Sequence, residues 1–170
     1  MGRILLFSAI AALLAACAGG PSSAPSSAGK TEAAQQIAEG NAARAQGDYA
    51  RAFAIFHRLA DAGDPTAEVA LGYLYANGQG VAQDQTEAMR LYRLAAAQGN
   101  AEGMNAIGYK YDHGTGVTRD PAKAIAWYRK AIAGGNPQAM NTLAILYFKG
   151  APGLARDWTK AVALWHEASD

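Results

Sequence analysis

The sequence contains a single cysteine, Cys17, among its 170 residues. A disulfide within one chain is therefore impossible, even in a compartment where disulfides form. Clusters of cysteines that hold structural zinc are excluded for the same reason. The fold must be held together by side-chain packing alone.

A surplus of positive charge is also missing. The chain has 15 basic and 14 acidic side chains, and removal of Arg3 with an N-terminal signal would leave 14 of each. Proteins that bind nucleic acid through its phosphates need a basic face, and no run of this sequence supplies one. The composition predicts no nucleic-acid partner, and it gives no support for electrostatic docking on anionic lipid.

The apolar run near the N-terminus is too short to span a bilayer. From Ile4 to Ala16 it would extend about 20 Å as a helix, whereas the hydrocarbon core is about 30 Å thick. One positive charge before the run and small residues at its end are typical of a cleaved export signal. We therefore expect a signal peptide over residues 1–16.

The residues at the cut site, "LAAC" from Leu14 to Cys17, resemble the lipobox of bacterial lipoproteins. The resemblance implies cleavage before Cys17 and lipidation of this cysteine, and two or three acyl chains make a stable membrane anchor. Ala18 follows, where an aspartate would suggest inner-membrane retention, so we expect the periplasmic side of the outer membrane rather than the inner membrane. Residues 17–30, rich in Gly, Ser, Pro and Ala, predict a flexible tether. An ordinary signal peptide with a chance cysteine is the alternative.

Residues arranged for catalysis or metal binding are few. The histidines His57, His113 and His166 form no H-x-x-x-H or H-E-x-x-H pattern of the kind that zinc sites use. His113 beside Asp112 is the one pair to consider for acid-base chemistry, and a position at the entry of an exposed loop is the preferred explanation. The sequence predicts no enzyme, no metal and no cofactor. A periplasmic hydrolase, or a protein that binds cell-wall fragments, is the alternative.

The sequence does contain an internal repeat, with a period of 36 residues that becomes 37 after Gly150. Each copy has two segments with apolar residues at i, i+3, i+4 and i+7, which is typical of helices. An Asp or Asn precedes each segment and predicts a helix cap. The expected caps are Asp64, Asn100 and Asn136 for the first helices, and Asp84, Asp120 and Asp157 for the second.

The first two copies also contain a G-x-G, "GQG" at Gly78 and "GTG" at Gly114, which could be mistaken for a phosphate-binding loop. A dinucleotide-binding loop needs a preceding strand and a third glycine. The third position is Gln83 in one copy and Arg119 in the next, and no strand is expected before either. Gly78 and Gly114 instead follow a helix, where a left-handed residue ends it. The motif therefore predicts a structural turn.

Gly72 and Gly108 fall inside the expected first helices, where glycine costs about 1 kcal/mol relative to alanine. A close approach between paired helices would offset this cost. The third copy has the small Ala144 at the same place. We therefore expect the two helices of each copy to pack closely at this position.

The stretches "LGYLYANGQGVAQDQTEAMRLYRLA" and "IGYKYDHGTGVTRDPAKAIAWYRKA" resemble the Sel1-like repeat, a relative of the tetratricopeptide repeat. Three copies are expected, over 65–100, 101–136 and 137–170, the last with a degenerate loop. A tetratricopeptide-like leading pair is expected over 31–64. The resemblance implies an all-α fold, a right-handed α-solenoid of helix-turn-helix repeats, whose first helices line a concave groove that binds proteins or peptides.

Residues of the first helices that lie off the apolar stripe are expected to face this groove. Asn105 and Asn141 occupy the same place in successive copies, and asparagines can hydrogen-bond the backbone of an extended peptide. Tyr73 and Tyr109 add amphipathic contact area. A merely solvated polar face is the alternative. The predicted protein-binding residues are Thr66, Tyr73, Asn77, Glu102, Asn105, Tyr109, Asp112, His113, Gln138, Asn141 and Lys149.

Together these features predict a non-catalytic scaffold or adaptor, lipid-anchored in the cell envelope, that binds a protein or peptide partner. Self-association is a further alternative. The last expected helix carries Trp158, Val162 and Trp165, although solenoids usually end in a polar capping element.

Overall fold

The computed structural model describes residues 27–151 and 154–167, and every regular element in these ranges is a helix, apart from an isolated bridge between Ala151 and Leu154. The prediction of an all-α fold is confirmed. The predicted signal peptide and lipidation site Cys17 lie outside the described residues. The helices are α1 (Ser27–Ala45), α2 (Tyr49–Asp61), α3 (Pro65–Asn77), α4 (Gln85–Ala97), α5 (Ala101–His113), α6 (Pro121–Ala133), α7 (Pro137–Lys149) and α8 (Trp158–Glu167).

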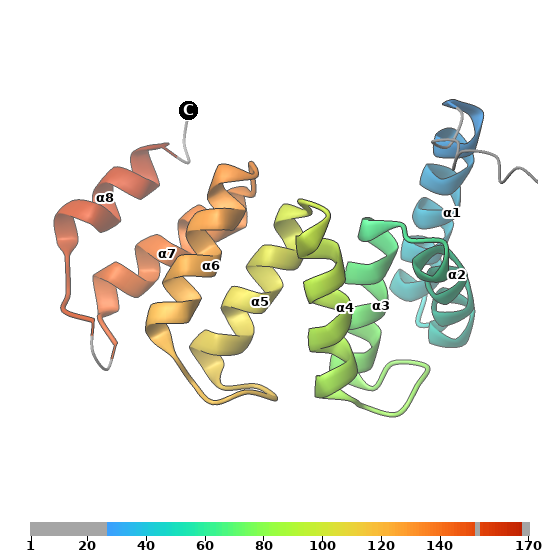
Figure 1. The fold of residues 1–170 in the computed structure, drawn as a ribbon, viewed down its shortest axis with the longest axis horizontal. Coiled ribbons are helices and arrows are strands. Elements are labelled where there is room, and N and C mark those ends of the chain that lie inside the picture. Colours follow the sequence, from blue (N-terminus) through green and yellow to red (C-terminus); the bar gives the residue numbers. More distant parts are fainter. Residues whose placement is uncertain (1–26, 152–153, 168–170) are drawn as a thin grey trace, which may run out of the picture.

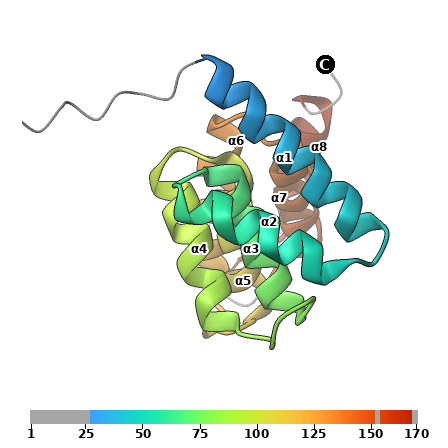
Figure 2. The same cartoon turned by 90° about the vertical axis from the view of Figure 1, so that its right-hand side faces the viewer.

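The helices follow one another in a row of pairs, from α1 and α2 at one end to α7 and α8 at the other (Figure 1). Contacts mainly join each helix to the next one in the chain, and α3 also touches α5. Figure 2 looks along this row from the α1 end. Units that contact only their neighbours form a solenoid, as the repeat predicts. None of the described helices is both long and apolar enough to cross a membrane.

The start of α1 differs from the sequence-based expectation. The helix begins at Ser27, so residues 27–30, expected to be part of the tether, are helical. Composition alone favoured a tether here because Ser and Gly are poor helix formers. The first helix pair is therefore longer at its N-terminus than the domain start at Thr31 predicted.

Each helix from α3 to α8 begins at the capping side chain expected from the sequence. The Asp64 carboxylate accepts hydrogen bonds from the backbone N–H groups of Thr66 and Ala67, both at 2.9 Å. Such a cap contributes about 1 kcal/mol. All six predicted caps are confirmed, with Asn100, Asn136, Asp84, Asp120 and Asp157 capping the other five helices.

The G-x-G loops end a helix and contact the preceding repeat. Gly78 and Gly114 are left-handed, with φ of 66° and 69°, and close α3 and α5. The second glycine of the first loop, Gly80, lies against α2: a Cβ on it would stand 2.5 Å from the carbonyl oxygen of Tyr49. The structural interpretation of the motif is confirmed.

This contact gives a testable difference between two glycines of similar backbone conformation. Gly80→Ala is expected to lower the free energy of unfolding by about 2–3 kcal/mol, because the methyl group meets backbone that cannot move aside. Gly99 has a similar φ of 85° and open space around it, so Gly99→Ala is expected to cost only the left-handed backbone term, about 1 kcal/mol. Thermal unfolding followed by circular dichroism measures both. Equal losses would contradict the loop contact.

Glycines in α3 and α5 let a tyrosine of the following helix pass over the backbone. A Cβ on Gly72 would stand 2.6 Å from the ring of Tyr92, and one on Gly108 would stand 2.7 Å from the ring of Tyr128. Both rings are buried, and burial raises the pKa of both hydroxyls. The close approach expected at these glycines is confirmed.

The core is divided into three clusters of buried side chains, formed mainly by α1 to α3, α3 to α5, and α6 to α8. Among the described residues, three buried positions are polar or charged: Glu68, Lys110 and Asn136. Lys110 is 5% exposed and stands where Leu74 and Leu146 stand in the neighbouring repeats. Its Nζ donates to the Oε1 of Gln85, and burial lowers the pKa of the amine.

Lys110→Leu is expected to raise the free energy of unfolding by about 1 kcal/mol at neutral pH, because a buried charge is replaced by an apolar side chain. The pKa of Lys110 is lower in the folded chain than in the unfolded one. The penalty is therefore full below the folded pKa and disappears as the pH rises toward the unfolded value. Urea unfolding at neutral pH and near pH 10 (roughly the unfolded pKa of lysine) measures the gain, which should shrink at the higher pH. A loss of stability at neutral pH would contradict this account.

Candidate protein-binding groove

The first helices of the three repeats, α3, α5 and α7, carry an apolar side chain at one equivalent position. These residues are Tyr73, Tyr109 and Ile145, which we call the groove stripe. Tyr109 exposes 50% of its surface and Ile145 exposes 37%, while Tyr73 is half-buried. Exposed apolar side chains that gather among polar neighbours are typical of protein-binding surfaces.

A hollow of about 550 Å³ lies beside the stripe, between the C-terminal ends of α5 and α7. It brings together three of the predicted groove residues, Asp112, His113 and Lys149. Sequence reasoning did not predict the other five lining residues, which are Arg119, Thr142, Ile145, Leu146 and Gly150. The full lining is Asp112, His113, Arg119, Thr142, Ile145, Leu146, Lys149 and Gly150.

One wall of the hollow is held by contacts within repeat 101–136. The ring of His113 stacks on that of Tyr109 with centroids 4.0 Å apart, and its Nδ1 lies 3.1 Å from the Tyr109 carbonyl oxygen. The Asp112 carboxylate is 3.9 Å from His113 Nδ1 and 3.8 Å from Arg119 Nη2. Asp112 and His113 therefore form no hydrogen-bonded acid-base pair, and the geometry favours a fixed binding wall.

The loop between the two helices is held by the same kind of hydrogen bond in each of the three repeats over 65–170. The side chain before the capping aspartate donates a hydrogen bond to a carbonyl oxygen in the last turn of the first helix, where carbonyl groups have no partner within the helix. When the three copies are aligned at offsets of 36 and then 37 residues, the three donor side chains fall at the same position. The sequence repeat could therefore have revealed these hydrogen bonds. The bonds are Gln83 Nε2 to Ala76 (2.8 Å), Arg119 Nε to Asp112 (2.6 Å) and Arg156 Nε to Lys149 (3.1 Å).

The two asparagines expected to act alike have different surroundings. Asn141 Oδ1 accepts a hydrogen bond from Trp165 Nε1 at 3.0 Å. Asn105 Oδ1 is buried and has no hydrogen-bond partner among the described residues, and the same holds for the hydroxyl of Tyr128, which stands at the position of Trp165. Neither asparagine presents a free, open acceptor. The residues of the groove stripe are therefore better placed than the two asparagines to contact a partner.

The remaining predicted residues lie along the same helices but do not line the hollow. They are exposed side chains on α3, α5 and α7, and Asn77 donates from Nδ2 to the Tyr73 carbonyl oxygen at 2.8 Å. A binding role for them stays a prediction. These residues are Thr66, Asn77, Glu102 and Gln138.

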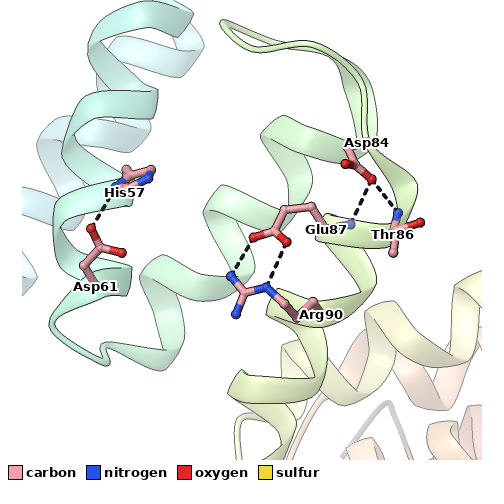
Figure 3. A network of polar contacts seen from close by, with 6 residues as sticks. All are labelled: His57, Asp61, Asp84, Thr86, Glu87 and Arg90. Carbon is pink, nitrogen blue, oxygen red and sulfur yellow. Dashed lines mark hydrogen bonds and ion pairs between the residues drawn. The ribbon is translucent and has the colours of Figure 1, made fainter.

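The second helices carry charged pairs on their exposed surface. His57 Nδ1 lies 2.9 Å from a carboxylate oxygen of Asp61 on α2, and Arg90 donates two hydrogen bonds of 2.6 and 2.8 Å to Glu87 on α4. Figure 3 shows both pairs. The hydrogen bond from Arg90 lowers the pKa of Glu87. Exposed pairs of this kind contribute less than about 1 kcal/mol each. No group of three His, Cys, Asp or Glu side chains within 27–151 and 154–167 is placed to hold a metal ion.

Comparison with known proteins shows the family. The model of the Sel1 repeat matches residues 39–64, 65–100, 101–136 and 137–170. The last three ranges are the copies expected from the sequence. The leading pair, expected as a tetratricopeptide-like unit, is matched as a Sel1 repeat from residue 39 onward. None of the curated proteins compared with the chain matches it.

Solved structures resemble the chain over most of its length. A Sel1 repeat protein from Oxalobacter formigenes is 30% identical with a TM-score of 0.72, over 85% of this chain and 60% of that chain. The protein c5321, a protective antigen present in uropathogenic Escherichia coli strains and displaying an SLR fold, is 28% identical with a TM-score of 0.70, over 84% of this chain and 31% of that chain. This chain thus spans less than two thirds of either one. On its four matched repeats and its α-solenoid fold, the chain belongs to the Sel1 repeat family.

Proposed function

We propose that the chain is a non-catalytic scaffold that binds a protein or peptide along the groove stripe and the adjoining hollow. Sel1 repeat proteins generally mediate protein–protein interactions. The observation that carries the proposal is the exposure of Tyr109 and Ile145 at equivalent positions of successive first helices, next to the hollow. When a partner covers the Tyr109 ring and the Ile145 side chain, their apolar surface is removed from water, and this favours binding.

The hollow supplies the polar part of the same surface. Asp112, Arg119 and Lys149 place charges of both signs around the apolar side chain of Ile145. A partner segment with one apolar side chain flanked by polar groups fits this pattern, since the apolar centre provides the affinity and the charged rim orients the partner.

The location in the cell is part of the proposal. The "LAAC" at Leu14 to Cys17 supports lipidation of Cys17, and Ala18 favours the periplasmic side of the outer membrane. A scaffold held there would collect its partner at the envelope.

Copurification from the envelope of cells that produce the protein tests the groove. The double variant Tyr109→Ala/Ile145→Ala is expected to lose at least nine tenths of the partner recovered with the wild type, because central apolar contacts dominate the affinity of such interfaces. Leu94→Ala is the matched control, since Leu94 is 41% exposed on α4 and lies outside the groove stripe. If the double variant and the wild type recovered equal amounts of the partner, the proposal would be wrong.

A further inference from the structure

An aromatic ring lies between successive repeats at two equivalent places. At the first place the ring of Phe53 on α2 lies 5.7 Å from that of Tyr75, in the cluster that contains the buried Leu91 of α4. At the second place Trp127 of α6 packs against the cluster of α3 to α5, which contains Met89. The offset of 36 residues aligns Phe53 with Met89 and Leu91 with Trp127. One ring at each place therefore fills the space between two repeats.

The third equivalent place carries two aliphatic side chains instead. The aligned residues there are Ile125 on α6 and Leu164 on α8. A pocket of about 310 Å³ opens beside Leu164, and the buried side chains of Leu143 and Tyr147 on α7 line it. Tyr147 is equivalent to Tyr75, so the pocket lies where the other two places hold an aromatic ring.

The pocket is on the side of α8 that faces the preceding repeat. The equivalent Trp127 belongs to the cluster of α3 to α5 rather than to that of α6 to α8. A helix that followed α8 would pack on its other side, as α7 packs on α6. The walls of the pocket come from α6, α7 and α8, which lie together at one end of the row (Figure 1). The replacement of an aromatic ring by leucine therefore accounts for the pocket.

Two cations lie beside the Tyr147 ring at the rim of the pocket. Arg129 Nη2 donates a hydrogen bond to the Tyr147 hydroxyl at 2.8 Å, and Lys160 Nζ lies 5.4 Å from the ring centroid. Lys160 is paired with Asp157 at 2.7 Å, whereas Arg129 forms no ion pair with any residue of 27–151 or 154–167. Glu167 also lines the pocket. The other N–H groups of Arg129 can therefore bind a carboxylate.

We propose that this pocket binds an aromatic carboxylic acid. The ring of the ligand takes the place that Trp127 fills in the preceding repeat, against the ring of Tyr147, and its carboxylate pairs with Arg129. The volume is at the lower end of the range for small-ligand pockets, which suits a ligand about the size of an indole acid. The site is separate from the groove stripe, because neither Tyr109 nor Ile145 lines it.

Ligand-observed NMR with the purified full-length protein tests the pocket, with indole-3-propionate as the probe. A Kd of about 1 mM or lower is expected from the usual affinity per atom of small ligands. Indole-3-propionamide has the same ring without the charge. It is expected to bind about tenfold more weakly, because it cannot form a charge-assisted pair with Arg129.

Substitution of the arginine tests the carboxylate contact. Arg129→Gln is expected to weaken binding of the acid about tenfold and to remove the difference between the acid and the amide. Arg93→Gln is the matched control, since Arg93 is exposed at the equivalent position of the preceding repeat and does not line this pocket. It should leave the affinity for both probes unchanged.

Substitution of the leucine tests the place of the ring. Leu164→Trp is expected to abolish binding and to raise the midpoint of thermal unfolding by about 3 °C, because it fills the pocket as Trp127 does in the preceding repeat. Tyr109→Ala/Ile145→Ala should leave probe binding unchanged. Failure of the groove proposal and failure of this one can therefore be distinguished.

A peptide that ends in tryptophan distinguishes two sources of the same chemistry. It presents a ring and a terminal carboxylate, as the free acid does. Binding about tenfold tighter than that of indole-3-propionate would assign the pocket to the C-terminal residue of a protein partner. Weaker or equal binding would assign it to a small molecule. Both results agree with the proposal.

Three results would overturn the proposal. If the wild type bound neither the acid nor the peptide, the pocket would be only a gap in packing. If Leu164→Trp kept its helical circular dichroism and still bound the acid, or if Arg93→Gln and Arg129→Gln weakened binding equally, the probe would bind elsewhere. Should Leu164→Trp fail to fold, the comparison of acid and amide in Arg129→Gln decides, and an unchanged difference between them would contradict the site.

Discussion

Tyr128→Ala is expected to lower the free energy of unfolding by about 3–5 kcal/mol, the range for removing a fully buried aromatic ring. Tyr128 is 0% exposed and belongs to the cluster that joins α6 to α7 and α8. Urea denaturation followed by circular dichroism measures the loss. Tyr109→Ala is the matched control, because Tyr109 is 50% exposed, and it should cost about 1 kcal/mol or less.

The glycine under the ring makes this prediction sharper. Gly108→Ala alone is expected to cost about 1–3 kcal/mol, because its methyl group would lie within 2.7 Å of the Tyr128 ring. In the Tyr128→Ala background the ring is gone, and alanine is a better helix former than glycine by about 1 kcal/mol. The same substitution should then stabilise the chain.

This reversal of sign is specific to direct packing between the two residues. Substitutions that act independently have additive effects. If Gly108→Ala destabilised the wild type and the Tyr128→Ala variant equally, the glycine would have some other role, and the account of how the paired helices approach would be wrong.

Cys17→Ser is expected to move the protein from the membrane fraction to the soluble fraction almost completely. Each buried methylene of an acyl chain contributes about 0.8 kcal/mol to membrane binding, so losing two or three chains changes the partition by many orders of magnitude. Fractionation of cells followed by immunoblotting measures the shift. The mass of the N-terminal peptide of the wild-type protein shows whether Cys17 begins the mature chain and carries lipid.

A second serine substitution provides the control. Ala18→Ser leaves the cysteine in place, so the protein should remain with the membrane. Membrane association unchanged by Cys17→Ser would contradict the lipid anchor, and a mature chain that does not begin at Cys17 would favour an ordinary signal peptide. The outcome has no bearing on the groove, since none of its residues lies near Cys17 in the sequence.

Features fixed by a few neighbouring residues could be predicted from the sequence. The caps at Asp64 and Asp120 could be predicted because the accepting side chain and donating N–H groups are close in the chain. The roles of Gly78 and Gly108 followed from their place relative to the helices and from recurrence at the same offset. Repetition of a pattern tests each local inference more than once.

Features that depend on contacts between helices could not be predicted in the same way. Asn105 and Asn141 occupy equivalent positions, but their surroundings differ because α8 carries Trp165 where α6 carries Tyr128. The burial of Lys110 could not be inferred either, since the Gln85 that receives its hydrogen bond belongs to the previous repeat. The positions of the groove residues on the first helices were therefore predictable from the repeat. Their side-chain contacts, which depend on neighbouring helices, were not.

The most direct test of the groove is site-specific photo-crosslinking in living cells. A photoreactive amino acid at Tyr109, in the groove stripe, should form a covalent product with a partner protein. The same amino acid at Ala126, exposed on α6, should form little or none. A product of equal yield from both positions, or from Ala126 alone, would contradict binding by the first helices.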